Sequence, residues 1–67
     1  MKLDKDKFKG LLYDNLITQG ELAKKSGISP STISALMKGK HNLGMTSING
    51  LVKVFGKEPI TNILIRD

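Results

Sequence analysis

The stretch Gln19–Lys38, with the sequence QGELAKKSGISPSTISALMK, begins as a short helix. Thr18 and Glu21 have the spacing of a capping box, in which each of the two side chains binds the backbone N–H of the other residue. Gly27 follows the last helical residue, and glycine commonly closes a helix because it tolerates a positive φ. The sequence therefore predicts one short helix that ends at Gly27.

A second helix starts almost at once. Ser29 is a favourable N-cap, Pro30 occupies the first helical position, where no amide hydrogen is needed, and Gly39 ends the helix. Its inner face, at the i, i+3, i+4 spacing of a helix, is formed by Ile33, Leu36 and Met37. Because so few residues separate the two helices, the pair has the helix-turn-helix arrangement, with the second helix presented outward.

Two further helices flank this segment. Asp4 can cap the first, and Thr46 can cap the fourth, which Gly56 ends. Their inner faces, at helical spacing, are formed by Phe8, Leu11 and Leu12 in the first and by Ile48, Leu51, Val52 and Phe55 in the fourth. The tail at residues 57–67 favours a short helix opened by Pro59, although its β-branched residues also suit a strand.

Composition limits what the chain can do. Its 67 residues suffice for one small domain, and with no Cys and one His they exclude disulfides and Cys/His zinc sites. No apolar run approaches the roughly 18 residues that span a bilayer, so we expect no membrane partner and a cytoplasmic location. One His and six acidic residues offer no acid–base or metal constellation, so we expect no catalytic residues, no cofactor and no metal site.

Charge is distributed unevenly along the chain. The net charge is +5, and no Asp or Glu occurs between residues 22 and 57, a segment that carries six lysines. Such a cationic segment points to an anionic partner, of which nucleic acid is the usual one. The chain has one Tyr, two Phe and no Trp, so it has few aromatic side chains that could stack on the bases of a single strand.

The segment Gln19–Lys38 closely resembles the helix-turn-helix of the lambda-repressor and Cro family. The positions that this family constrains sterically are occupied here by Ala23, Gly27, Ile28, Ile33 and Leu36. The resemblance covers roughly residues 5 to 60 and implies an all-α, four- to five-helix lambda-repressor-like domain that binds double-stranded DNA. We therefore expect one DNA-binding domain over residues 1–67, with the helix-turn-helix at 19–38.

The resemblance also implies which residues meet DNA. The outward positions of the second motif helix, which read base edges in the family, are occupied by Pro30, Ser31, Ser34 and Ala35. Phosphate contacts are expected from Gln19, Thr32, Lys38, Lys40 and Asn42. The motif helix lacks Gln, Asn and Arg, which make bidentate contacts to bases, so strong direct readout is not expected. His41, in the same basic loop, is interpreted as a solvated side chain.

One expected core contact departs from the family pattern. Many family members pair an Arg in the first helix with a Glu late in the third. Leu12 and Met37 occupy those places here. We expect these two side chains to touch, because an apolar pair can replace a buried ion pair without loss of stability.

These features predict a transcriptional repressor or a Cro-like regulator of a genetic switch, of phage or prokaryotic type, located at the nucleoid. We expect no sensor or protease domain after the helices, which favours a Cro-like protein. A homodimer on a palindromic operator is expected, because two-fold symmetry places two motif helices on half-sites about 34 Å apart. A dimer contact is predicted for part of the apolar tail, which comprises Ile60, Ile63, Leu64 and Ile65.

The alternative is a protein-interaction module, an antirepressor or antitoxin that acts by binding another repressor or a toxin. The motif helix, which lacks Gln, Asn and Arg, and the apolar tail both favour this alternative. The acid-free basic segment favours DNA. Retention on a heparin or duplex-DNA column at moderate salt discriminates between the two functions.

Overall fold

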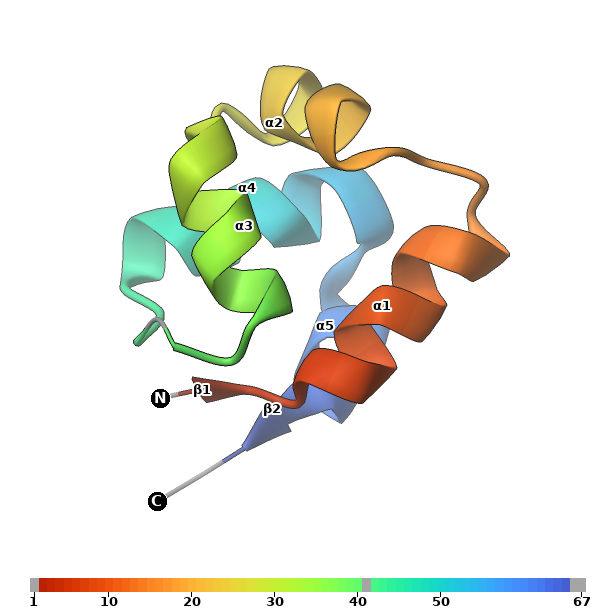
Figure 1. The fold of residues 1–67 in the computed structure, drawn as a ribbon. Helices are drawn as coiled ribbons and strands as arrows, with labels where there is room; N and C mark the ends of the chain where they lie inside the picture. Colours follow the sequence, from red (N-terminus) through yellow and green to blue (C-terminus); the bar gives the residue numbers. More distant parts are fainter. Residues whose placement is uncertain (1, 41, 66–67) are drawn as a thin grey trace.

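Within the described residues, 2–40 and 42–65, the computed structural model contains five short helices and one pair of very short strands (Figure 1). In chain order the elements are β1 (Lys2–Leu3), α1 (Lys5–Asp14), α2 (Gln19–Ser26), α3 (Pro30–Met37), α4 (Met45–Phe55), α5 (Lys57–Ile63) and β2 (Leu64–Ile65). The predicted all-α fold with four to five helices is confirmed, and the two strands are an addition to it.

Local capping explains where the first three helices begin. Asp4 accepts two backbone N–H bonds at the start of α1. Thr18 and Glu21 form both bonds of the capping box at α2. The Ser29 hydroxyl caps α3, and Pro30 is the first residue of that helix. All three predicted helix starts are confirmed.

The start of α4 differs from the prediction. The helix begins at Met45, after an N-cap at Gly44 that makes no side-chain hydrogen bond. Thr46, the predicted cap, lies instead inside the first turn, because the extended backbone that a cap requires is found at Gly44. The end of α4 is as predicted, since Gly56 follows its last residue with a φ of 95°.

The tail contains both of the structures that its sequence suits. The helix α5 begins at Lys57, two residues before the predicted start at Pro59, and ends at Ile63. The chain then becomes β2, which pairs antiparallel with β1. Leu3 lies opposite Leu64 in this pairing. The Asp4 N–H also donates to the Ile63 carbonyl at 2.8 Å. The two ends of the described chain are therefore tied together, next to the start of α1 (Figure 1).

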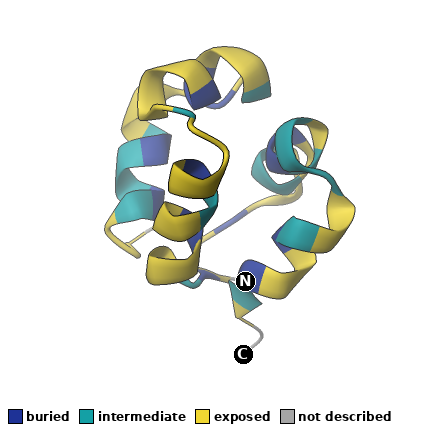
Figure 2. Ribbon diagram, turned by 90° about the vertical axis from the view of Figure 1, so that its right-hand side faces the viewer, coloured by how far each residue is buried: buried dark blue, intermediate teal, exposed yellow. Residues whose placement is uncertain are grey.

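The core lies where the helices converge, and their buried positions face it (Figure 2). Its largest fully buried side chains are Phe8, Leu22, Ile33, Leu36, Leu51 and Ile60. Leu12 is buried, and Met37 is half-buried and packs against the core, so neither member of the expected pair lies in solvent. Direct contact between Leu12 and Met37 stays a prediction.

The helix α4 approaches the end of α2 very closely at Gly50. A Cβ atom on this residue would lie 2.6 Å from the Ser26 carbonyl oxygen and 3.3 Å from the Ile28 Cγ1 atom. A larger residue therefore fits here only if the backbone shifts. This contact holds the end of α2, and with it the turn that leads into α3, against the rest of the fold.

Candidate nucleic-acid interface

The turn between α2 and α3 is fixed by its backbone conformation and by one serine. Gly27 adopts the predicted left-handed conformation, with a φ of 75°, and its N–H donates to the Ala23 carbonyl at 3.1 Å. The Ser26 hydroxyl donates to the Leu22 carbonyl at 2.6 Å and accepts the Ile28 N–H at 3.2 Å. These bonds define the course of the turn, so α3 leaves α2 in a fixed direction.

The N-terminus of α2 carries Gln19 beside the capping box. The Thr18 N–H donates to Glu21 Oε1 at 3.2 Å, and the Glu21 N–H donates to Thr18 Oγ1 at 3.1 Å. Gln19 is exposed and can reach a neighbouring molecule. The Glu21 carboxylate offsets the positive end of the helix dipole. A phosphate near this helix end therefore depends on the Gln19 amide more than on the dipole.

The outer face of α3 is uncharged and carries only short side chains. Pro30 and Ser31 are exposed, whereas Ser34 and Ala35 are half-buried. After the helix the chain folds back, and the Lys40 N–H donates to the Ala35 carbonyl at 3.1 Å. Helical spacing places the four residues predicted to face bases on one surface, and the first turn of α3 is its more accessible part.

The hydroxyl groups at the start of α3 form a small network. Ser29 Oγ donates to Thr32 Oγ1 at 2.8 Å and accepts the Thr32 N–H at 3.3 Å. Ser31 Oγ lies 3.4 Å from Ser29 Oγ. Thr32, a predicted phosphate contact, is half-buried, but its own hydroxyl hydrogen is still able to donate one further bond.

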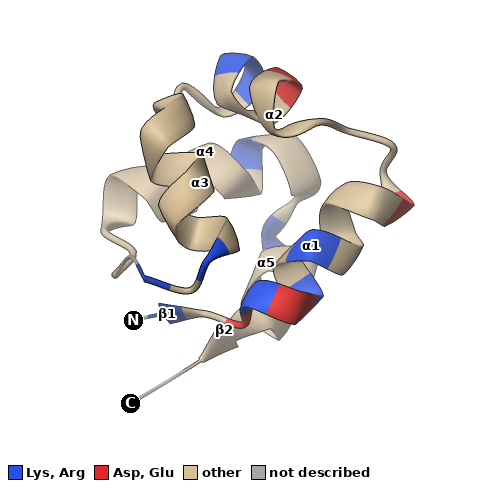
Figure 3. Cartoon of the chain, viewed as in Figure 1, with Lys and Arg blue, Asp and Glu red and all other residues tan. Residues whose placement is uncertain are grey.

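Three lysines gather at the C-terminal end of α3. Lys38 is the C-cap residue, and Lys40 follows Gly39, which has a φ of 72°. Lys5 of α1 joins them, because a Cβ atom on Gly39 would lie 3.3 Å from the Lys5 Cδ atom. All three lysines are exposed. Figure 3 shows basic positions at the C-terminal end of α3 and none along the helix itself.

Sequence reasoning missed Lys5, because no local pattern relates it to Lys38 or Lys40. Their proximity comes from the packing of α1 against α3. Asn42, the last predicted phosphate contact, is exposed, and the next residue, Leu43, is buried in the core and anchors this loop. His41 lies outside the described residues.

Comparison with known proteins identifies the family. A model of the helix-turn-helix family matches residues 14–61, which include the whole of α2, α3 and α4. The chain belongs to the helix-turn-helix family. An uncharacterized HTH-type transcriptional regulator from Methanothermobacter thermautotrophicus is 35% identical to it over 51 residues, which are 76% of this chain and 74% of that protein. No solved structure matches the chain significantly.

These findings confirm the resemblance to the lambda-repressor and Cro type of helix-turn-helix. They support a function of this chain in DNA-binding transcription regulation. The described residues contain no group of three His, Cys, Asp or Glu side chains that could hold a metal ion. In the same part of the chain, no helix has the length and apolar character needed to cross a membrane.

The tail residues predicted for a dimer contact in this helix-turn-helix chain differ in their exposure. Ile60 and Ile63 are 1% and 6% exposed and pack in the core. Leu64 is half-buried, and Ile65 is 47% exposed. Ile60 therefore closes the core of its own chain and has almost no surface to offer. Ile63, by contrast, has an edge that lines a groove between α1 and α5.

Proposed function

We propose that this chain binds double-stranded DNA sequence-specifically, as a transcriptional repressor or a Cro-like switch regulator in the cytoplasm, at the nucleoid. It acts as a homodimer on a palindromic operator. The observation that carries the proposal is the outer face of α3, which is uncharged and has only short side chains, together with the three exposed lysines that lie near the C-terminal end of this helix. Such a helix suits a groove whose floor is formed by bases, and the cations beside it suit the phosphates.

In this proposal α3 enters the major groove with its first turn leading. Pro30 and Ser31 stand nearest to the base edges, and Ser34 and Ala35 follow one turn later. Each serine hydroxyl both donates and accepts a hydrogen bond, so it tolerates several bases. Pro30 and Ala35 offer apolar surface that suits thymine methyl groups.

Phosphate contacts fix the register of the helix from both of its ends. Gln19 and Thr32 act near the start of α3, and Lys38, Lys40 and Asn42 act near its end. We add Lys5 to this set because it lies against Gly39. The proposed phosphate contacts are thus Lys5, Gln19, Thr32, Lys38, Lys40 and Asn42.

Short side chains give modest discrimination between bases. A mismatch should therefore cost about 1 kcal/mol, the lower end of the usual range for a base pair in a specific site. The short side chains also let α3 lie close to the groove floor, so groove width and bendability contribute to specificity. In an operator selected from a random duplex pool, Ser31→Ala should relax the preference at one position per half-site with little loss of affinity.

Titration of duplex DNA at several salt concentrations tests the proposal. A dimer that makes roughly 6–10 phosphate contacts loses about 10³–10⁵ in affinity between 50 and 200 mM salt. Lys5→Ala, Lys38→Ala and Lys40→Ala should each weaken binding to operator and random duplex alike. Lys57→Ala, on α5, is the matched control and should leave the affinity unchanged. An affinity that is flat with salt contradicts the proposal.

A second candidate function is an interaction module, an antirepressor or antitoxin that binds a partner repressor or a toxin. The observation that favours it is the apolar pair Tyr13 and Leu16 at the end of α1, which are 81% and 86% exposed. Apolar side chains that stay in solvent together suit a protein partner. Two results together would support this second function instead. The chain would show no affinity for duplex DNA at low salt, and its effect on a partner repressor would require Tyr13 and Leu16.

A further inference from the structure

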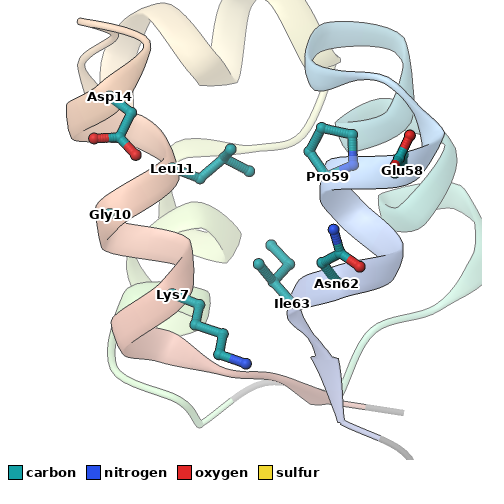
Figure 4. Close-up of a pocket in the computed structure, with 8 residues that line it drawn as sticks. All are labelled: Lys7, Gly10, Leu11, Asp14, Glu58, Pro59, Asn62 and Ile63. Atoms are coloured by element: carbon teal, nitrogen blue, oxygen red, sulfur yellow. The ribbon is translucent and has the colours of Figure 1, made fainter.

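A groove of about 650 Å³ runs between α1 and α5, away from the proposed DNA contacts on α3 (Figure 4). The α1 side is formed by Lys7, Gly10, Leu11 and Asp14, and the α5 side is formed by Glu58, Pro59, Asn62 and Ile63. Leu11 and Ile63 point into the space between the two helices, so the floor of the groove is apolar (Figure 4). None of these residues belongs to the candidate nucleic-acid interface.

Gly10 opens the middle of this groove. A Cβ atom on Gly10 would meet no atom within 4 Å, and its φ is not positive, so neither packing nor backbone conformation requires glycine here. Glycine in the middle of a helix weakens it. The surface above Gly10 is therefore open to a side chain of another molecule.

The charges of the groove are arranged by sign. Asp14 on α1 and Glu58 on α5 lie on opposite sides of one end of the groove, and Lys7 lies at the other end (Figure 4). All three side chains are exposed. One end of the groove is thus acidic and the other is basic, with apolar surface between them. Such a surface suits a partner that has the same pattern in the opposite direction.

On the α1 side of the groove, the basic, apolar and acidic positions are spaced so that a two-fold axis can pair them with their opposites on a second α1 helix. Lys7, Gly10, Leu11 and Asp14 share one helix face at i, i+3, i+4 and i+7 spacing. Lys7 and Asp14 lie at equal distances along the chain from the midpoint between Gly10 and Leu11. A two-fold axis through that midpoint therefore places Lys7 of each α1 helix opposite Asp14 of the other, and Leu11 of each helix opposite Gly10 of the other.

We propose that this groove binds a second copy of the same chain, with the two α1 helices antiparallel. Leu11 of one copy fills the space over Gly10 of the other, and its Lys7 lies between Asp14 and Glu58 of the other. The contact is isologous and closes after two copies, as a point-group dimer requires. The inference deepens the homodimer part of the proposed function and rests on it, and the tests below separate the two.

Charge reversal with rescue in a mixture tests this interface by sedimentation. Lys7→Glu sets like charges against each other at both ends of the dimer, and Asp14→Lys combined with Glu58→Lys does the same with the opposite sign. Each variant alone should raise the dimer Kd at least about tenfold. An equimolar mixture of the two should dimerise, because the heterodimer has opposite charges at both ends. Failure of the mixture to dimerise overturns the charge pairing.

Gly10→Gln separates a loss of the interface from a loss of folding. Gln favours helix more than Gly does, and a Cβ atom at this position meets no atom of its own chain within 4 Å, so the variant should be at least as resistant to heat as the original protein. It should nevertheless remain monomeric, because the side chain fills the space that Leu11 of the second copy occupies. A dimer with unchanged Kd in this variant overturns the proposal.

Lys9→Glu is the matched charge control, since Lys9 is exposed on α1 but does not line the groove. It should keep the original dimer Kd. A protein that remains monomeric at millimolar concentration, with or without duplex DNA, overturns the inference and leaves the groove to another partner. Monomeric variants that still bind a half-site in a salt-dependent way show that DNA binding stands even where the interface fails.

Discussion

The ends of α1 and α3 share one hydrogen-bond pattern but are built from different residues. At the end of α1, the Leu16 N–H donates to the Tyr13 carbonyl and the Ile17 N–H donates to the Leu12 carbonyl, both at 3.1 Å. This pair of bonds is the Schellman motif, which satisfies two carbonyls that a helix end otherwise leaves unpaired. Leu16 takes the left-handed position, with a φ of 53°.

The end of α3 repeats the motif with glycine in the left-handed position. The Gly39 N–H donates to the Leu36 carbonyl and the Lys40 N–H donates to the Ala35 carbonyl, again both at 3.1 Å. Gly39 has no Cβ atom, so its φ of 72° causes no strain. Leu16 in the same conformation costs about 1–2 kcal/mol. One helix end is therefore relaxed and the other is strained.

The side chains that accompany each motif explain the difference. Leu12 is buried and Ile17 packs against the core, so the turn after α1 is held by apolar contacts. At the end of α3 the equivalent places are taken by Ala35, which lies within the helix and is half-buried, and by Lys40, which follows the helix and is exposed. The end of α1 thus anchors the chain at the expense of strain, whereas the end of α3 presents cations from an unstrained turn.

The comparison predicts its largest effect for Leu12→Ala. Truncation of a buried leucine should lower the free energy of unfolding by about 2–5 kcal/mol. Total stability for a chain of this length is roughly 3–10 kcal/mol, so the variant should be partly or largely unfolded. Urea denaturation followed by circular dichroism measures the change. At the equivalent position in the last turns of α3, Ala35→Gly should cost no more than about 1 kcal/mol. Equal losses at the two positions contradict the comparison.

Gly39→Ala tests whether the end of α3 is relaxed only because it has glycine. A Cβ atom at this φ should cost about 1–2 kcal/mol of stability, and the Lys5 side chain must also move aside. Thermal denaturation measures the loss. Gly20→Ala is the matched control: Gly20 lies within α2 without a positive φ, so alanine there should stabilise the chain by about 0.5–1 kcal/mol. A loss at both positions means that the positive φ of Gly39 is not the cause.

Thr18→Ala tests the other side of the strained turn, where the chain passes directly from Ile17 into the capping box of α2. The substitution removes the two bonds of the Thr18 hydroxyl, one donated to Glu21 Oε1 and one accepted from the Glu21 N–H, and should cost about 1 kcal/mol. Thr61→Ala makes the same substitution at an exposed position of α5, where the hydroxyl only donates back to the Lys57 carbonyl, and it should be nearly neutral. If both threonine variants lose the same stability in urea, the capping box does not hold this turn.

The sequence predicts those parts of the fold that depend on contacts between residues close together in the sequence. Thr18, Gly27 and Ser29 act through bonds that span a few residues, so the helix-turn-helix could be derived position by position. The pairing of β1 with β2 could not, because each strand has two residues and its partner lies at the other end of the described chain. The place of Lys5 in the candidate site was hidden for the same reason, since it depends on how α1 packs against α3.

Leu16 shows a different limit of sequence reasoning. A glycine in its place would have predicted the left-handed turn, as Gly39 does after α3. A leucine there gives no such signal, because most leucines in a chain do not adopt a positive φ. The turn exists because Leu12 and Ile17 pack on the core and hold the residue between them in this conformation.

Leu16→Asn should give the smallest effect, and it is a gain. Asn adopts the left-handed conformation more readily than Leu does, so the substitution relieves strain without the added chain entropy of glycine. Because Leu16 is 86% exposed, little buried apolar surface is lost. The free energy of unfolding should rise by a few tenths to about 1 kcal/mol. Leu16→Ala keeps the unfavourable backbone and should change stability by less than about 0.5 kcal/mol. If Asn destabilises the chain while Ala does not, the turn is not strained at Leu16, and its difference from the end of α3 lies only in the side chains that flank it.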